Sequence, residues 1–206
     1  MASGQPNTPP AFADAFRQGI RVGFKWDRFL ADNWPVRSAR LTTPDGLRQC
    51  LLPWYLGGSG REVAYNEPDA KPLRLSSIPQ VLDSLKADRQ ARIQRFVAQF
   101  KLATAPVEFS VPAYSLASDG YLVLDGNHRL SALTLSSVPF AISLWSVCGP
   151  LEDDCLPDLV HWSKSQSAQP GSPAGARRPG VRSFGIGGFR IIQAFQVEGA
   201  KCTLDT

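Results

Sequence analysis

The sequence predicts an α+β protein with a small mixed β-sheet flanked by helices, and three observations favour this class. Residues 77–101 place apolar side chains at helical spacing. Alternating and continuous apolar runs typical of strands follow, and a short helical segment separates the last two. Hydrophobic residues make up 43% of the 206 residues, which suffices for a core and excludes a wholly disordered chain.

The N-terminal half is expected to contain helices and loops. Residues 1–10 are rich in Pro, Asn and Ser, which predicts a flexible tail. From Ala11 to Trp34 apolar residues recur at roughly helical spacing. Residues 53–76 hold many turn-forming residues and are expected to be mostly loop. Ser77–Lys101 is expected to be one long helix, with Pro79 in its first turn.

The next segment predicts the order strand, turn, strand, helix, strand. Residues 107–111 alternate as in a strand that Pro112 ends or places at a sheet edge. Residues 121–124 and 140–147 are continuous apolar runs, as in buried strands. A helix is expected from Asn127 to Leu133 between them. These elements assign residues 11–162 to one domain.

The C-terminal part differs in composition. Residues 163–182 are rich in Gly, Pro and Ser and are expected to form a flexible basic segment. The segment contains four of the 22 basic residues and no acid, so the rest of the chain is neutral although the net charge is +4. Bulk charge is therefore no evidence for a nucleic-acid surface. Residues 183–206 are expected to be strands that pack back on the domain.

The location expected from the sequence is the cytoplasm. No apolar run approaches the roughly 20 residues that span a membrane, and no secretory signal is visible. The four cysteines form no Cys-x-x-Cys pair, so reduced thiols are favoured. A contact between Cys148 and Cys155 across a loop is the alternative.

One motif carries chemistry, the run Asp125-Gly126-Asn127-His128-Arg129. A strand is expected to end at Asp125, Gly126 permits a tight turn, and Asn127 suits a helix N-cap. The free backbone N–H groups at the helix start then form an anion site, for which phosphate is the usual ligand. The alternative is that the same side chains only cap the helix and pair with acids.

The side chains of the motif sharpen this hypothesis. Arg129 offers a bidentate grip on phosphate, and His128 can donate to an oxyanion or move a proton near neutral pH. Asp125 can hold a metal ion or accept a proton from a hydroxyl. Asp125 and His128 are therefore the candidate catalytic residues, and Asp125 is the candidate metal ligand.

VLDGNHRLSAL, with VEFSVPAYSL before it and PFAISLWSV after it, resembles the core of the ParB/sulfiredoxin superfamily. The resemblance covers residues 105–147, about a fifth of the chain. It implies the ParB/sulfiredoxin-like fold. It also implies that Gly126, Asn127, His128 and Arg129 hold nucleotide phosphates.

The members of this superfamily differ in chemistry. Sulfiredoxin carries Gly-Cys-His-Arg, and Asn127 stands at the cysteine position, so thiol chemistry is not expected. Partition proteins carry Gly-Glu-Arg-Arg and a helix-turn-helix domain, for which residues 148–206 show no convincing helix pair. The motif is most similar to the Asp-Gly-His-His-Arg-like motif of the stand-alone free-serine kinases, from which it departs at Asn127.

The resemblance to these kinases implies phosphoryl transfer from a nucleotide, ATP or ADP and possibly CTP, to a small-molecule hydroxyl with Mg²⁺. It also implies a catalytic glutamate in an N-terminal segment, for which Glu62 and Glu67 are candidates and Glu108 a weaker one. Arg89 and Arg92 are candidates for further phosphate contacts.

Two other functions stay open from the sequence. One is a ParB-like nucleic-acid-binding protein or nuclease, which is possible but not favoured. The other is a nucleotide-binding sensor without catalysis. His161 is expected to be packed or exposed rather than in the site. The tryptophans Trp26, Trp34 and Trp54 are expected to belong to the core rather than to stack on a base.

Overall fold

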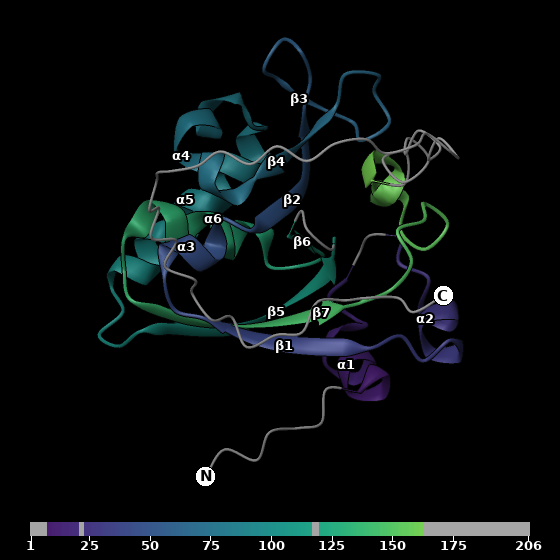
Figure 1. Cartoon of the computed structure of the whole chain (residues 1–206). Helices are drawn as coiled ribbons and strands as arrows, with labels where there is room; N and C mark the ends of the chain where they lie inside the picture. Colours follow the sequence, from purple (N-terminus) through teal and green to yellow (C-terminus); the bar gives the residue numbers. More distant parts are fainter. Residues whose placement is uncertain (1–7, 21–22, 117–119, 163–206) are drawn as a thin grey trace, which may run out of the picture.

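The computed structural model describes residues 8–20, 23–116 and 120–162, which form a seven-stranded mixed β-sheet with helices on both faces (Figure 1). The strand order is β1-β7-β5-β6-β2-β3, and β4 also pairs with β2. β5 and β7 are parallel, as are β2 and β6, and the other pairs are antiparallel. The strands are β1 (Val36–Leu41), β2 (Cys50–Leu56), β3 (Glu62–Val63), β4 (Lys71–Arg74), β5 (Val107–Ser115), β6 (Tyr121–Val123) and β7 (Phe140–Val147). The predicted α+β class with a mixed sheet is confirmed.

The helices are short except for α5. The α-helices are α1 (Pro9–Phe16), α2 (Trp26–Ala31), α3 (Pro44–Leu47), α4 (Ile78–Val81), α5 (Ala87–Lys101) and α6 (Asn127–Ser136). The 3₁₀ turns are η1 (Leu75–Ser77), η2 (Leu82–Ser84) and η4 (Pro157–Leu159). Helix α6 connects β6 to β7, and α5 precedes β5.

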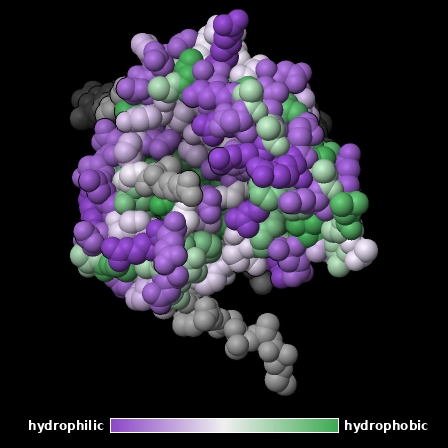
Figure 2. Space-filling view, turned by 180° about the vertical axis from the view of Figure 1, so that it is seen from behind, coloured by the Kyte–Doolittle hydropathy of each residue, from purple (hydrophilic) through white to green (hydrophobic). Residues whose placement is uncertain are grey.

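The sheet separates two hydrophobic cores because successive side chains of a strand point to opposite faces. On one face, Val111 and Val123 pack with residues of α4, α5 and α6 such as Ile93 and Leu130. On the other face, Tyr114 of β5 and Leu122 of β6 pack with α1, α2 and the segment after β7. On the outer surface that Figure 2 shows, hydrophilic residues predominate and hydrophobic residues form smaller patches.

The predictions for residues 107–147 are confirmed, with one correction at Pro112. β6, α6 and β7 lie where they were expected. β5 instead runs through Pro112 to Ser115, and it is a central strand between β7 and β6. The carbonyl oxygen of Pro112 accepts from the N–H of Leu124 at 2.9 Å. The N–H that proline lacks costs the strand one donor, and the pairing continues on either side.

The single helix expected over Ser77–Lys101 is wrong. The chain forms the short helix α4 and the turn η2 and then becomes extended at Leu85 and Lys86, so α5 begins only at Ala87. Leu85 is buried at the break, and the backbone N–H of Lys86 donates to the carboxylate of Glu62 at 3.0 Å. The helical spacing of apolar residues continues through this break, but a contact with Glu62 of β3 interrupts the helix there.

Two N-terminal predictions also need correction. The loop expected over residues 53–76 includes the end of β2, all of β3 and all of β4. Pro53 lies where the register between β2 and β4 shifts, an irregularity that accommodates a proline in a strand. Helix α1 begins at Pro9, inside the expected flexible tail, and Thr8 caps it by accepting from the N–H of Ala11 at 3.4 Å.

Three further expectations concern the C-terminal segments, membrane-spanning helices and the cysteines. The segments 163–182 and 183–206 lie outside the described residues. Among the helices that the structure describes, none has the length and apolar character to cross a membrane. Cys50 and Cys155 carry free, buried thiols, so Cys155 is not joined to Cys148.

Candidate functional site

The turn between β6 and α6 presents unpaired backbone N–H groups. Gly126 has a φ of +86°, which side-chain-bearing residues rarely adopt, and it is the N-cap of α6 in place of the expected Asn127. The first bond of the helix runs from the Leu130 N–H to the Gly126 carbonyl at 2.9 Å. The N–H groups of residues 127–129 precede this bond and have no helical acceptor, as an anion site requires.

All five motif residues line one cavity of about 880 Å³. The parallel strands β2 and β6 end at the same edge of the sheet, which brings the Trp54 region beside the motif. Helix α5 packs along α6 and supplies a second wall. The polar and charged side chains that line the cavity are Glu62, Lys86, Arg89, Arg92, Arg95, Gln99, Asp125, Asn127, His128, Arg129 and Asp158.

The cavity is rich in cations, which come mainly from α5. Arg89 donates from Nε to Oε1 of Glu62 at 2.8 Å, so its charge is matched. Arg92 and Arg95 also line the cavity and form no ion pair with any residue that the structure describes. From α6, Arg129 lies over the ring of Phe109 at 4.6 Å. The cavity therefore favours anionic ligands.

Glu62 anchors a stack of side chains from four elements. Its side chain is 4% exposed and also lies 3.7 Å from Nζ of Lys86. The guanidinium of Arg89 lies 4.7 Å from the ring centre of Trp54, and that ring centre lies 5.1 Å from the ring centre of His128. This stack links β3, α5, β2 and α6 behind the Asp125–Arg129 turn.

His128 is held in its neutral form by its surroundings. Burial lowers the pKa of its imidazole below 6.5, and the positive charges of Arg89 and Arg92 lower it further. Nε2 of His128 and Oδ1 of Asn127 are buried, and neither has a hydrogen-bond partner among the described residues. An uncompensated buried polar atom is costly, so either atom would gain stability from a hydrogen-bond partner.

Besides Glu62, two carboxylates line the cavity, and they differ in exposure. Asp125 is 44% exposed on its side chain and lies 4.0 Å from Nη2 of Arg129, so its oxygens are available. Gly19 approaches it so closely that a Cβ there would lie 3.0 Å from Oδ2. Asp158 is buried and accepts a short hydrogen bond from the Tyr55 hydroxyl. Sequence reasoning missed Gly19 and Asp158, because each is isolated in the sequence and carries no motif.

The other sequence candidates lie elsewhere. Glu67 is exposed and does not line the cavity, and Glu108 pairs with Arg40 on the exposed strand surface at 3.0 Å. His161 lies in an adjoining cavity and stacks on Tyr55. Trp34 and Trp54 are buried in the cores, as expected. Trp26 is half-buried and packs against the second core.

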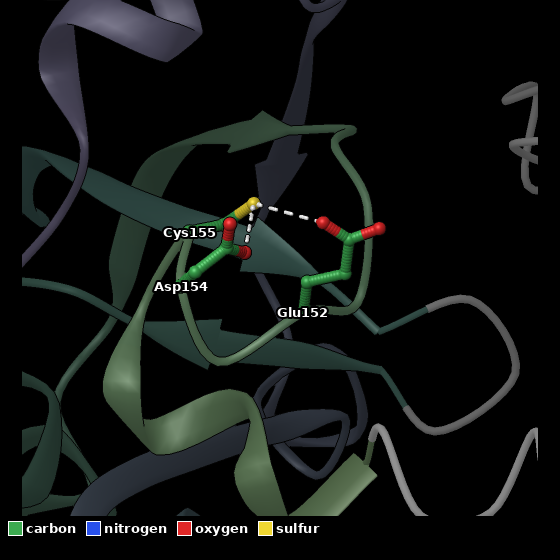
Figure 3. Close-up of side chains that lie close together, drawn as sticks. All are labelled: Glu152, Asp154 and Cys155. Carbon is green, nitrogen blue, oxygen red and sulfur yellow. Dashed lines mark hydrogen bonds between the residues drawn. The ribbon is translucent and has the colours of Figure 1, made fainter.

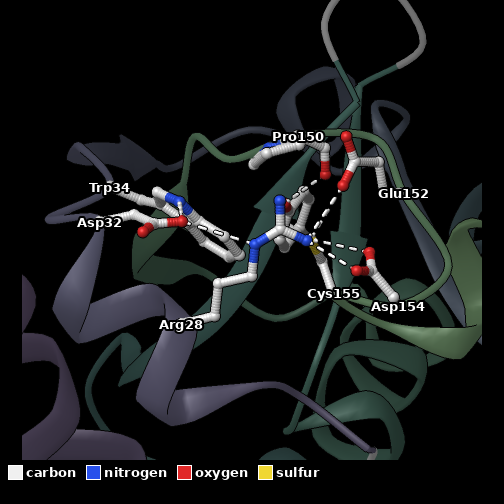
Figure 4. Close-up of polar contacts among 8 residues, drawn as sticks. Arg28, Asp32, Trp34, Pro150, Glu152, Asp154 and Cys155 are labelled. Carbon is white, nitrogen blue, oxygen red and sulfur yellow. Dashed lines mark hydrogen bonds and ion pairs between the residues drawn. The ribbon is translucent and has the colours of Figure 1, made fainter.

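A second polar cluster lies in the segment after β7. Glu152, Asp154 and Cys155 approach one another closely enough to suggest a metal site (Figure 3). Nη1 of Arg28 lies 3.0 Å from Glu152, 2.8 Å from Asp154 and 3.1 Å from the Cys155 sulfur (Figure 4). Burial raises the pKa of the Cys155 thiol to about 12, so the group is not a thiolate at neutral pH. The guanidinium already supplies the cation of this cluster.

Comparison of the chain with protein-family models, with curated proteins and with solved structures finds no match. The resemblance of residues 105–147 to the ParB/sulfiredoxin superfamily therefore stays a prediction. What the site can do follows from its own geometry, a helix start with free N–H groups beside a neutral histidine, an exposed carboxylate and arginines that have no ion pair within the described residues.

Proposed function

We propose that this protein transfers a phosphoryl group from a nucleotide to the hydroxyl of a small molecule, as a kinase of ParB/sulfiredoxin-like fold. The observation that carries the proposal is the meeting of the Asp125–Arg129 turn with Arg89, Arg92 and Arg95 in one cavity. Positioning and electrostatic stabilisation provide most of the catalysis in phosphoryl transfer, and these residues supply both.

We assign a separate role to each group of residues in the cavity. The N–H groups of Asn127, His128 and Arg129 and the guanidinium of Arg129 hold the phosphates. Arg92, which lacks an ion pair within the described residues, neutralises charge that develops on the transferred group. Neutral His128 donates a hydrogen bond or relays a proton, since its lowered pKa keeps it uncharged at pH 7.

Asp125 is the group that receives the proton of the acceptor hydroxyl. Its exposed carboxylate also has the hard oxygen ligands that Mg²⁺ prefers, and Mg²⁺ supplies charge neutralisation when it is bound with the nucleotide. Glu62 is less suited to be the base, because Arg89 and the Lys86 N–H already occupy its oxygens. We assign to Glu62 the positioning of Arg89.

Binding is tested first by thermal unfolding with ATP, ADP, CTP and GTP, each with and without Mg²⁺. A ligand at about 100 times its Kd stabilises the folded state by about 2.7 kcal/mol. One nucleotide is expected to stabilise the wild type and Arg40→Ala, whose arginine lies outside the cavity, but not Arg129→Ala. No stabilisation by any nucleotide contradicts the proposal.

The backbone contribution is tested with two matched glycines. Gly126 and Gly60 both have positive φ, +86° and +74°, so alanine at either site costs about 1–2 kcal/mol of folding free energy. Only Gly126→Ala is expected to weaken nucleotide binding, because Gly60 does not line the cavity. Equal loss of binding in both variants would show that the turn has no special role.

Turnover separates a kinase from a sensor. Asp125→Asn keeps the shape of the side chain and removes its basicity, so we expect it to bind nucleotide and to lose at least about a hundredfold in kcat, a typical contribution of a general base. The measurement is nucleotide consumption across a panel of hydroxyl-bearing metabolites. Nucleotide binding without turnover in the wild type favours the non-catalytic sensor.

Nucleic-acid binding is the second candidate, and one observation favours it. Arg92 and Arg95 are exposed on the same side of α5, where they can meet a phosphate backbone. Binding of this kind weakens steeply with salt, because counterions are released. A filter-binding series from low to high salt tests it, and affinity for RNA or DNA that Arg92→Gln and Arg95→Gln remove would replace the kinase proposal.

A further inference from the structure

A second cavity, of about 540 Å³, adjoins the first cavity, the one that the Asp125–Arg129 turn lines. Tyr65 lines both of them. The volume lies in the range of about 300–1,000 Å³ that small-molecule sites occupy. The second cavity is lined by polar Asn66, Asp153 and His161 and by apolar residues that include Pro68 and Pro157, and none of the lysines and arginines that the structure describes lines it. It is therefore suited to the uncharged part of a ligand whose anionic part lies in the first cavity.

The first cavity offers charge rather than open aromatic surface. Trp54 and Tyr55 line it but are only 3% and 2% exposed, so their faces are not available to a ligand. Phe96 of α5 lines it as well, but its ring packs against Phe100 of the same helix with a centroid distance of 5.9 Å. A heterocyclic base therefore finds little stacking surface beside the Asp125–Arg129 turn.

Tyr65 provides that surface at the junction of the two cavities. It is 40% exposed, which is unusual among the large hydrophobic side chains of the described chain. Bases stack on such rings with little dependence on their identity. A ligand that places phosphates at Arg129 and extends past Tyr65 enters the second cavity, because the two cavities share this residue.

A hydrogen bond from His161 holds the loop that carries Tyr65 in place. Nε2 of His161 donates to the backbone carbonyl of Tyr65 at 2.8 Å, which fixes the tautomer of a neutral His161. The imidazole of His161 stacks on Tyr55 with a centroid distance of 4.8 Å, and Tyr55 donates to buried Asp158. This arrangement prepares the stacking surface before a ligand arrives, which reduces the entropic cost of binding.

We infer that the second cavity binds the nucleoside part of the nucleotide, with the base on Tyr65 and the ribose hydroxyls near Asp153 and Asn66. A carboxylate and an amide can accept and donate the hydrogen bonds that ribose and base edges offer. The inference rests on the proposed function, since it divides one nucleotide between the two cavities.

The test separates the two parts of the ligand with two probes. Tripolyphosphate reports on the first cavity, and the nucleoside of the nucleotide selected by thermal unfolding reports on the second. Calorimetry is expected to show that Tyr65→Ala weakens nucleoside and nucleotide binding by about fivefold or more and leaves tripolyphosphate unchanged. Tyr65→Phe, which keeps the ring, is expected to bind like the wild type, and Arg129→Ala is expected to weaken tripolyphosphate and not the nucleoside.

The outcomes distinguish the inference from the function beneath it. Nucleotide binding that depends on Arg129 but not on Tyr65 overturns the nucleoside site and leaves the proposed function standing. A raised KM for the acceptor in Tyr65→Ala, with unchanged nucleotide affinity, gives the cavity to the acceptor and also overturns the inference. Absence of any nucleotide binding by the wild type contradicts both.

A measurement on the wild type guards against a variant that does not fold. Nucleoside added to the native protein is expected to shift the NMR signals of Tyr65 and His161, while tripolyphosphate shifts those of Arg129. Nucleoside shifts confined to α5 and the start of α6 would place the base in the first cavity and overturn the inference.

Discussion

At the scale of single residues, one half-buried histidine, His128, shows how the cavity controls charge. His128 is partly removed from water and lies near two arginines, and both conditions disfavour its protonated form. A phosphate bound at the start of α6 would bring negative charge to the same place. The pKa of His128 is therefore sensitive to an anion bound in the cavity.

We predict that an NMR titration places the pKa of His128 below 6.5 and that Arg92→Gln raises it, because one repelling charge is removed. The chain has two histidines, so His161→Gln assigns the signals. The folded state binds fewer protons than the unfolded state, so the contribution of His128 to stability is complete above pH 6.5 and is lost as pH falls through the folded-state pKa. A His128 pKa above 6.5 in the free protein would contradict this account.

At the scale of elements, Glu62 decides where the longest helix begins. Its carboxylate accepts from the backbone N–H of Lys86 immediately before α5 and from the side chain of Arg89 in the first turn. A negative group at this position also interacts favourably with the helix dipole. Strand β3 has only two residues, so the hydrogen bonds of Glu62 make up much of the contact between β3 and α5.

We predict that Glu62→Gln lowers the free energy of unfolding by about 1–3 kcal/mol, since a buried charge-assisted bond is lost. The lower part of this range applies because Lys86 is 64% exposed and its pair is screened by water. Urea denaturation measures the effect, and Glu67→Gln, at an exposed residue in the turn after β3, is the control. Equal stability of the two variants would show that Glu62 does not hold α5.

At the scale of the whole molecule, Arg28 of α2 joins the N-terminal helices to the segment after β7. It bonds to Glu152, Asp154 and the Cys155 sulfur, and its Nε lies 3.4 Å from Asp32 (Figure 4). This segment leads to Asp158 and His161, which underlie the two cavities. A contact outside both cavities therefore supports the segment that forms part of their walls.

We predict that Arg28→Gln lowers the Tm, because the carboxylates around it then repel one another. Salt screens such repulsion, so the loss should shrink between 50 mM and 1 M salt. Arg17→Gln, whose partner Asp27 is fully exposed at 3.9 Å, is the control and should change little. Thermal unfolding measures both variants, and a loss that is independent of salt would point to packing on Trp34 instead.

The sequence by itself determined β6, α6, β7 and the first half of β5, because hydrophobic periodicity and turn residues act over a few neighbours there. It also identified the Asp125–Arg129 turn, whose chemistry is contiguous. Only the tertiary structure decided the break before α5, because the contact that ends the helix pattern comes from Glu62, 24 residues earlier. The same holds for the cavity, in which Gly19, Asp158 and the arginines of α5, all distant from the turn in the sequence, come to lie beside it. Contacts between distant segments leave no local pattern, so a single sequence does not show them.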